Sequence, residues 1–97
     1  MKVKIISRRV FRIDQKTEIA HLLGKLRKAA EKQEGFISRS SNTSLNDPGD
    51  CIVISEWKTA DHWAQWMNKK KTKKLQGEID SLLGEKTFFD VYKQEAF

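Results

Sequence analysis

The stretch CIVISEW, residues 51–57, is the part of the 97-residue chain that most constrains the fold. Its β-branched residues and the absence of Gly and Pro predict a strand. Ile52 and Ile54 lie on one face of that strand, and Val53 and Trp57 lie on the other. A sheet with one face in water alternates more regularly between apolar and polar residues. We therefore expect both faces of this strand to be covered.

On the N-terminal side, this strand is preceded by a turn and by a more polar strand. Pro48 presets φ at the second position of the turn in residues 46–50, and Gly49 is expected to take a positive φ at the third. The turn joins residues 51–57 to a Ser-rich strand from Phe36 to about Ser44. The polar character of that strand suits a sheet edge or a cavity wall.

The remaining segments predict a further strand, two helices and a last strand. Residues 2–13 read as the first strand, which shows apolar residues at both parities. Asp14 is expected to cap a helix whose apolar stripe recurs at helical spacing and which ends at Gly35. Thr59 caps a second helix that ends at Gly84, with a kink or break at the lysine run 69–74. Residues 87–92 form the last strand.

The resulting order, β-α-β-β-α-β, predicts an α+β, ferredoxin-like fold with a four-stranded antiparallel sheet. Residues 1–97 form a single domain, because a chain of this length has no room for a second core. Right-handed crossovers place both helices on one face of the sheet. The other face would expose a large apolar patch, and no element remains to cover it. We therefore expect a homodimer.

Charge and composition narrow the possible partners. The net charge of +6 is concentrated in the run from Lys69 to Lys74. No nucleic-acid-binding motif accompanies the run, so we interpret it as a solvated face and expect no nucleic-acid partner. No apolar run approaches a membrane span, and no signal-peptide pattern is present. The single Cys51 and the absence of zinc-ligand spacing favour a cytoplasmic protein without a metal site.

A few side chains stand out as candidates for chemistry. His62 and Trp66 are four residues apart on the second helix and Trp63 lies between them, so they share one flank. Trp66 could form the wall of a pocket for a flat aromatic molecule, and His62 could act as a base. Structural roles remain open for all three. Arg8, Arg9 and Arg39 stand on strands, where a long cation either has a partner or holds an anion. Tyr92 offers a hydroxyl.

Five segments, in this order, resemble the antibiotic biosynthesis monooxygenase domain family. They are EGFIS (residues 34–38), DPGD (47–50), IVISEWK (52–58), HWAQW (62–66) and TFFDVY (87–92). The likeness covers essentially the whole chain and implies the dimeric α/β barrel, in which two ferredoxin-like sheets pack face to face. It also implies an oxygenase of phenolic or quinol-type substrates that needs neither metal nor flavin, because the substrate itself supplies electrons to O₂.

Related members degrade haem, with a tryptophan on the second helix, an asparagine on the first strand and a histidine ten residues after the tryptophan. Trp66 matches the tryptophan. The other two positions fall on Ser7 and Gln76, and a carboxamide does not replace an imidazole ligand. This departure weakens the haem-degrading interpretation.

We therefore predict a cofactor-independent monooxygenase that uses O₂ on a small aromatic, phenolic or quinol-like substrate. The candidate catalytic residues are Trp66, His62 and Arg39. The candidate substrate-binding residues are Ser7, Phe36, Trp63, Gln76 and Tyr92. No cofactor and no metal are expected. Two alternatives stay open: a haem-binding or haem-degrading monooxygenase, and a non-catalytic domain that binds a small ligand.

Overall fold

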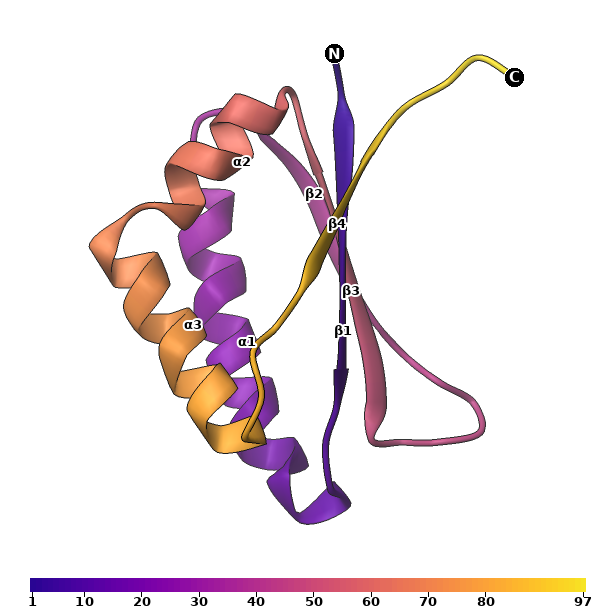
Figure 1. Ribbon diagram of the computed structural model, residues 1–97, viewed down its shortest axis with the longest axis vertical. Helices are drawn as coiled ribbons and strands as arrows, with labels where there is room; N and C mark the ends of the chain where they lie inside the picture. Colours follow the sequence, from indigo (N-terminus) through magenta and orange to yellow (C-terminus); the bar gives the residue numbers. More distant parts are fainter.

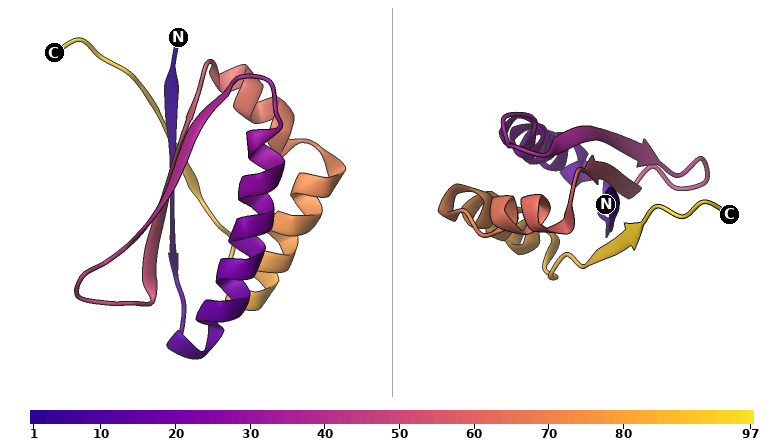
Figure 2. Two further views of the ribbon diagram at one scale, coloured as in Figure 1. Left: turned by 180° about the vertical axis from the view of Figure 1, so that it is seen from behind. Right: turned by 90° about the horizontal axis from the view of Figure 1, so that it is seen from above.

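The computed structural model describes residues 1–97 and confirms the ferredoxin-like α+β architecture. One antiparallel sheet has the strand order β2-β3-β1-β4. Its strands are β1 (Val3–Val10), β2 (Phe36–Thr43), β3 (Asp50–Trp57) and β4 (Phe89–Lys93). The helices are α1 (Lys16–Glu31), α2 (Ala60–Met67) and α3 (Lys70–Leu83), and a short 3₁₀ helix η1 (Ile13–Gln15) leads into α1. All of them lie on one face of the sheet (Figure 1 and Figure 2).

The core lies between the helices and the sheet. The apolar stripe of α1 is buried as its spacing predicts, at Ile19, Leu22, Leu23, Leu26 and Ala30. The helix-facing residues of β3 are buried at every second position. Trp57 is fully buried at the end of β3, where its ring stacks on Trp66 of α2. This aromatic pair holds α2 against the sheet. Large aromatic side chains bury the most apolar area per residue and therefore contribute strongly to core stability.

The opposite face of the sheet carries no helix, as predicted. Half-buried Ile6, Ile52 and Ile54 lie in its middle, and Val10 is 47% exposed. No other segment of the chain crosses this face (Figure 2). Ion pairs lie beside the apolar residues: Lys4 with Glu56 at 3.7 Å, and Arg8 with Asp50 at 2.7 Å. The face is therefore apolar at its centre and charged around it.

The turn before β3 differs from its prediction. The hairpin itself is confirmed, but Gly49 has no positive φ. Glycine is needed there for space, because a Cβ atom would lie 2.1 Å from the backbone oxygen of Phe11. The close approach is fixed by a hydrogen bond from the Phe11 amide to the Gly49 carbonyl, 2.8 Å long.

The ends of the first strand and first helix were also predicted wrongly. The strand β1 stops at Val10, before the expected end at Ile13, which is 62% exposed in η1. Asp14 does not cap α1, since it lies inside η1 and pairs with Arg12. Gly35 has a positive φ of 86°, but it follows the C-cap Lys32 by three residues and belongs to the turn into β2.

The second half of the chain follows the prediction more closely. Thr59 caps α2 through its hydroxyl oxygen, and Gly84 ends α3 with a φ of 74°. The expected break separates α2 from α3 at Asn68 and Lys69. The lysines of the run are exposed, whereas Thr72 among them is buried. The last strand begins at Phe89, two residues later than expected.

Candidate active site

A small cavity lies between the sheet and the three helices. Its volume is about 10 Å³, which is room for about one water molecule. We call it the central cavity; its polar and aromatic lining residues include Ser7, Arg9, Arg39, Trp63, Trp66 and Gln76. No carboxylate lines it. The cavity therefore concentrates cations and aromatic rings without an acidic partner in its wall.

The strands place two arginines beneath the helices. Arg9 has the same parity on β1 as Val3 and Ile5, so it faces the helix layer and is only 3% exposed. Arg39 on the edge strand β2 is paired in register with Ser55 of β3 and faces the same way. Alternation along each strand fixes these directions. Arg8, one residue from Arg9, faces the helix-free side and pairs with Asp50.

Arg9 is only partly satisfied. Its Nη1 donates to the Ser7 hydroxyl at 3.0 Å, and its Nη2 donates to Gln76 Oε1 at 3.3 Å. Its Nε is buried without a hydrogen-bond partner. Burial lowers the pKa of Arg9, and the negative charge of Asp80 opposes that change. One guanidinium N–H thus stays available to an acceptor inside the cavity.

Arg39 is half-buried and makes no ion pair within the chain. Burial, together with the nearby positive charges of Arg9 and Arg27, lowers the pKa of Arg39 to about 10. The guanidinium still carries its charge at neutral pH. Placing a second cation beside Arg9 with no carboxylate between them opposes stability. The same arrangement favours binding of an anion.

Aromatic rings form the remaining wall. Trp66 is 4% exposed and stacks on Trp57, with ring centres 5.4 Å apart and planes inclined by 26°. The indole Nε1 of Trp66 is buried without a partner. Trp63 is half-buried and meets Phe89 edge to face at 5.7 Å. A buried indole N–H usually finds an acceptor, so Trp66 supplies a second free donor beside the arginines.

Gln76 is held by a network from α3. Its Nε2 donates to Asp80 Oδ1 at 2.8 Å and to Thr87 Oγ1 at 2.9 Å. Thr87 itself donates to the same Asp80 oxygen through its hydroxyl and its amide. These bonds leave Oε1 of Gln76 directed at Arg9. Asp80 therefore positions Gln76, and through it the guanidinium of Arg9.

The structure brings together five of the eight residues singled out from the sequence. Ser7, Arg39, Trp63, Trp66 and Gln76 line the central cavity. The other three lie elsewhere.

The Nδ1 atom of His62 shares a 2.7 Å hydrogen bond with Thr59 Oγ1, and the imidazole ring packs over Gly35. Phe36 packs edge-on against Trp57. Tyr92 is exposed on β4. None of these three is in the cavity wall.

Two kinds of residue in the cavity wall were not singled out as site residues. Arg9 was considered only as one of three strand arginines, although its parity with the buried positions of β1 would have pointed to it. The other lining residues not singled out are Ile5, Leu26, Val53, Ser55, Met67 and Phe89. The positions of Met67 and Phe89 depend on how α2 and β4 pack, which no local pattern specifies.

The sequence model of the antibiotic biosynthesis monooxygenase family matches residues 3–78 of this chain. The match covers well over half of the chain, so the protein belongs to this family. Members of the family are typically dimeric. No curated protein matches the chain in sequence. None of its helices combines the length and apolar character needed to cross a bilayer.

Solved structures share the fold at low sequence identity. A conserved protein from Methanosarcina mazei Go1 has a TM-score of 0.89 at 18% identity, with 98% of this chain and 94% of that chain covered. Rv0793 from Mycobacterium tuberculosis has a TM-score of 0.86 at 14% identity, covering 100% and 98%. SnoaB, a cofactor-independent oxygenase from Streptomyces nogalater, has a TM-score of 0.85 at 11% identity, covering 99% and 95%.

The residues present do not fit haem. The position at which haem-degrading relatives place a histidine is Gln76, whose carboxamide is committed on both sides to Arg9, Asp80 and Thr87. His62 is one turn before Trp66, but it lies outside the cavity wall against Gly35. No imidazole therefore faces the cavity, and we route no chemistry through an iron ligand.

Proposed function

We propose that this protein is a cofactor-independent monooxygenase that holds a small phenol or quinol as its anion in the central cavity. The observation that carries the proposal is the pair of guanidinium groups, buried Arg9 and half-buried Arg39, in a wall without a carboxylate. A phenolate is the form of such a substrate that gives electrons to O₂. Donors fixed in a water-poor cavity stabilise an oxyanion better than water does.

The residues divide into three roles. Arg9 and Arg39 bind the phenolate oxygen and lower the pKa of the bound phenol. Trp66 provides the flat wall against which the ring lies, and its free Nε1 donates to an oxyanion. Gln76 is a positioning residue, because it fixes the Arg9 guanidinium through the Asp80 network. Solvent water takes the phenol proton.

The proposed reaction is balanced by the substrate and O₂ alone. The phenol loses its O–H proton, and the electron-rich ring carbon para to the oxygen forms a C–O bond with O₂. The resulting peroxide anion takes a proton. The O–O bond then breaks as the same carbon loses its hydrogen, giving a quinone and water. The carbon is oxidised, O₂ is reduced, and no external reductant enters.

A substrate has to open the cavity. An aromatic ring cannot enter a volume of about 10 Å³, so side chains must move. Arg39 and Met67 in the wall are long and unbranched, which makes them suited to this movement. Closure around the bound ring would then exclude water from the anion.

We also propose that the working form is a homodimer built on the helix-free face. The apolar centre of that face, at Ile6, Ile52 and Ile54, supports this, as does the tendency of the family to dimerise. Contact there leaves the helix layer, and hence the central cavity, unobstructed. The buried free thiol of Cys51 supports a cytoplasmic location.

Oxygen consumption tests the proposed activity. Purified protein is incubated aerobically with a panel of phenols and quinols in an oxygen-electrode cell, beside the Arg9→Met variant. We expect uptake above the buffer rate for at least one compound, with one O₂ consumed per quinone formed, and loss of that uptake in the variant. Binding without uptake across the panel contradicts the proposal and favours the non-catalytic ligand-binding alternative.

A further inference from the structure

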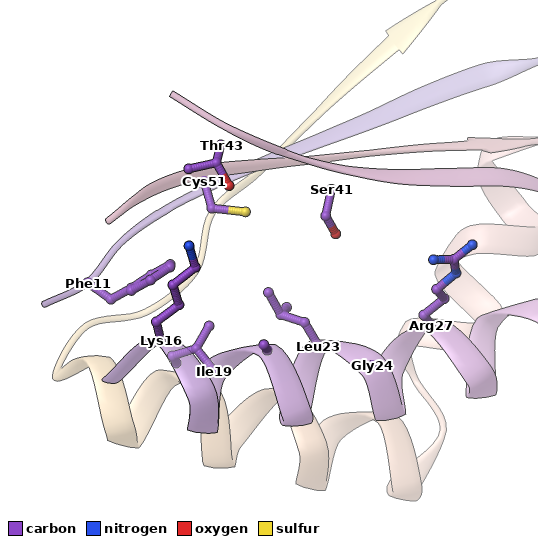
Figure 3. A pocket seen from close by; sticks show the side chains of 10 residues that line it. Phe11, Lys16, Ile19, Leu23, Gly24, Arg27, Ser41, Thr43 and Cys51 are labelled. Atoms are coloured by element: carbon purple, nitrogen blue, oxygen red, sulfur yellow. The ribbon is translucent and has the colours of Figure 1, made fainter. Parts of the chain in front are cut away.

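A second cavity opens at the other end of the helix layer, between the start of α1 and the far ends of β2 and β3 (Figure 3). Its volume is about 260 Å³. We call it the α1 pocket; the lining side chains that matter below are Phe11, Lys16, Leu23, Arg27, Thr43 and Cys51. It shares no lining residue with the central cavity.

The α1 pocket has an apolar interior and cationic ends. Phe11, Leu23 and Cys51 supply the apolar surface. The Lys16 side chain rises from α1 into the pocket toward the strands, and Arg27 stands at the opposite end (Figure 3). No carboxylate is part of the lining. An apolar pocket with a few convergent polar groups is the usual form of a small-molecule site.

The two cations are not neutralised by the rest of the chain. Lys16 makes no ion pair. Arg27 pairs only with Glu31, at 3.7 Å and with both side chains at least half exposed, a geometry that contributes little. Arg27 is also close enough to Arg39 to help lower its pKa. The positive potential along this side of α1 is therefore open to an anion.

Gly24 keeps the pocket wall open. It lies in the middle of α1, where glycine costs about 0.5–1 kcal/mol relative to alanine. A Cβ atom placed there would meet nothing within 4 Å, so neither packing nor backbone conformation requires glycine. A larger side chain at this position would enter the α1 pocket, whose lining includes Gly24.

We propose that the α1 pocket is a binding site for a small amphipathic anion, a carboxylate on an apolar body of one or two rings. The carboxylate pairs with Lys16 or Arg27, and the ring body packs on Phe11 and Leu23. The volume, slightly below the roughly 300–1,000 Å³ of drug-sized pockets, matches a ligand of this size. The site is independent of the oxygenase proposal, since it uses none of the central-cavity residues.

The test is calorimetric titration of the full chain with naphthoate and with the neutral naphthalenemethanol. We expect naphthoate to bind at least about fivefold more tightly than the alcohol, as a charge-assisted contact predicts. Of the Lys16→Gln and Arg27→Gln variants, the one that removes the cation paired with the carboxylate should weaken naphthoate binding; unchanged binding in both would overturn the proposal. Naphthoate should also slow alkylation of the single Cys51, which lines the pocket.

A matched glycine pair locates the site. Gly24→Leu should abolish naphthoate binding by filling the pocket. Gly77→Leu should not, because Gly77 is also a mid-helix glycine with nothing within 4 Å of an added Cβ, but lies outside this pocket. Circular dichroism checks that both variants fold. Absence of naphthoate binding to the wild type overturns the proposal. So does equal binding of the alcohol, or naphthoate binding that survives Gly24→Leu.

Discussion

Arg39 is the residue at which stability and function oppose each other most clearly. Its half-buried side chain lies near Arg9 with no hydrogen bond of its own, and its pKa falls to about 10. A cation with a lowered pKa is less stable in the folded chain than in the unfolded one, at every pH below that value. This cost is relieved as the pH rises through about 10. A bound anion relieves it at neutral pH.

Replacing Arg39 by leucine should therefore stabilise the chain. We expect Arg39→Leu to raise the free energy of unfolding by about 1 kcal/mol, since an apolar side chain replaces a half-buried, unpaired charge, while binding of phenolic anions is lost. Urea denaturation measures the first effect. Arg8→Leu is the control, because Arg8 is exposed and ion-paired; it should bring no gain. A destabilised Arg39→Leu would contradict the reading of Arg39 as an uncompensated cation.

Asp50 offers a separate pH prediction. Arg8 donates two hydrogen bonds to Asp50, at 2.9 and 2.7 Å, which lower the pKa of that carboxyl group. The stabilisation is present above the unfolded pKa of about 3.9 and is lost as the pH falls through the lower folded value. NMR titration should show the pKa of Asp50 returning toward its usual range in Arg8→Gln. The same pKa in both proteins would argue against the ion pair.

Among the elements, the turn between α1 and β2 depends on Gly35. Its φ of 86° is in the left-handed region, and a Cβ atom would lie 2.3 Å from Cγ of His62 on α2. The imidazole is fixed in turn by its hydrogen bond to Thr59. His62 thus locks the start of α2 onto this turn, which gives it a structural role.

Gly35→Ala should destabilise the chain by at least about 1–2 kcal/mol from the backbone alone, with a further loss from the contact with His62. Gly24→Ala is the matched control, and we expect it to stabilise by up to about 1 kcal/mol as a helix-interior replacement. Thermal unfolding of the two variants beside the wild type measures both changes. Similar melting temperatures for Gly35→Ala and Gly24→Ala would refute this assignment.

The sequence patterns predicted the elements well where the signal is local. The Thr59 cap, the Gly84 stop and the hydrophobic stripe of α1 depend on a few neighbouring residues, and all three are confirmed. Gly49 was predicted for the wrong reason, because its need for glycine comes from Phe11, thirty-eight residues earlier in the chain. Thr87, where the last strand is expected to begin, instead donates its amide to Asp80 Oδ1, and β4 begins at Phe89.

The cavity residues were predictable where the signal is local or matches the family. Ser7, Trp66 and Gln76 came from resemblance to the family and Trp63 from helical spacing, and all line one cavity. His62 has the same helical spacing, but it lies at the first turn of α2, beyond the edge of the cavity. Strand parity separates Arg9 from Arg8, whereas the reach of Met67 and Phe89 into the cavity is set by tertiary packing.

At the scale of the whole molecule, the two faces of the sheet differ. The helix-covered face holds the central cavity and the α1 pocket, and the helix-free face is where we propose that two copies associate. We expect sedimentation at micromolar concentration to show a species of twice the 11.3 kDa chain mass. Ile54→Asp, at the centre of the helix-free face, should convert the dimer to a monomer. Ile37→Asp should not, because Ile37 is exposed at the start of β2, next to the turn from α1. A monomeric wild type would contradict the proposed dimer, in which two sheets pack face to face.

If Arg9 and Arg39 hold a phenol as its anion, the absorption spectrum of a bound chromogenic nitrophenol should report it. The phenol is titrated with protein at a pH one unit below its own pKa, in the wild type and in Arg39→Met. We expect growth of the phenolate absorption band, equivalent to a phenol pKa lowered by about 1–3 units, and a smaller shift in the variant. A bound phenol that keeps its neutral spectrum, or a shift that Arg39→Met leaves unchanged, would contradict it.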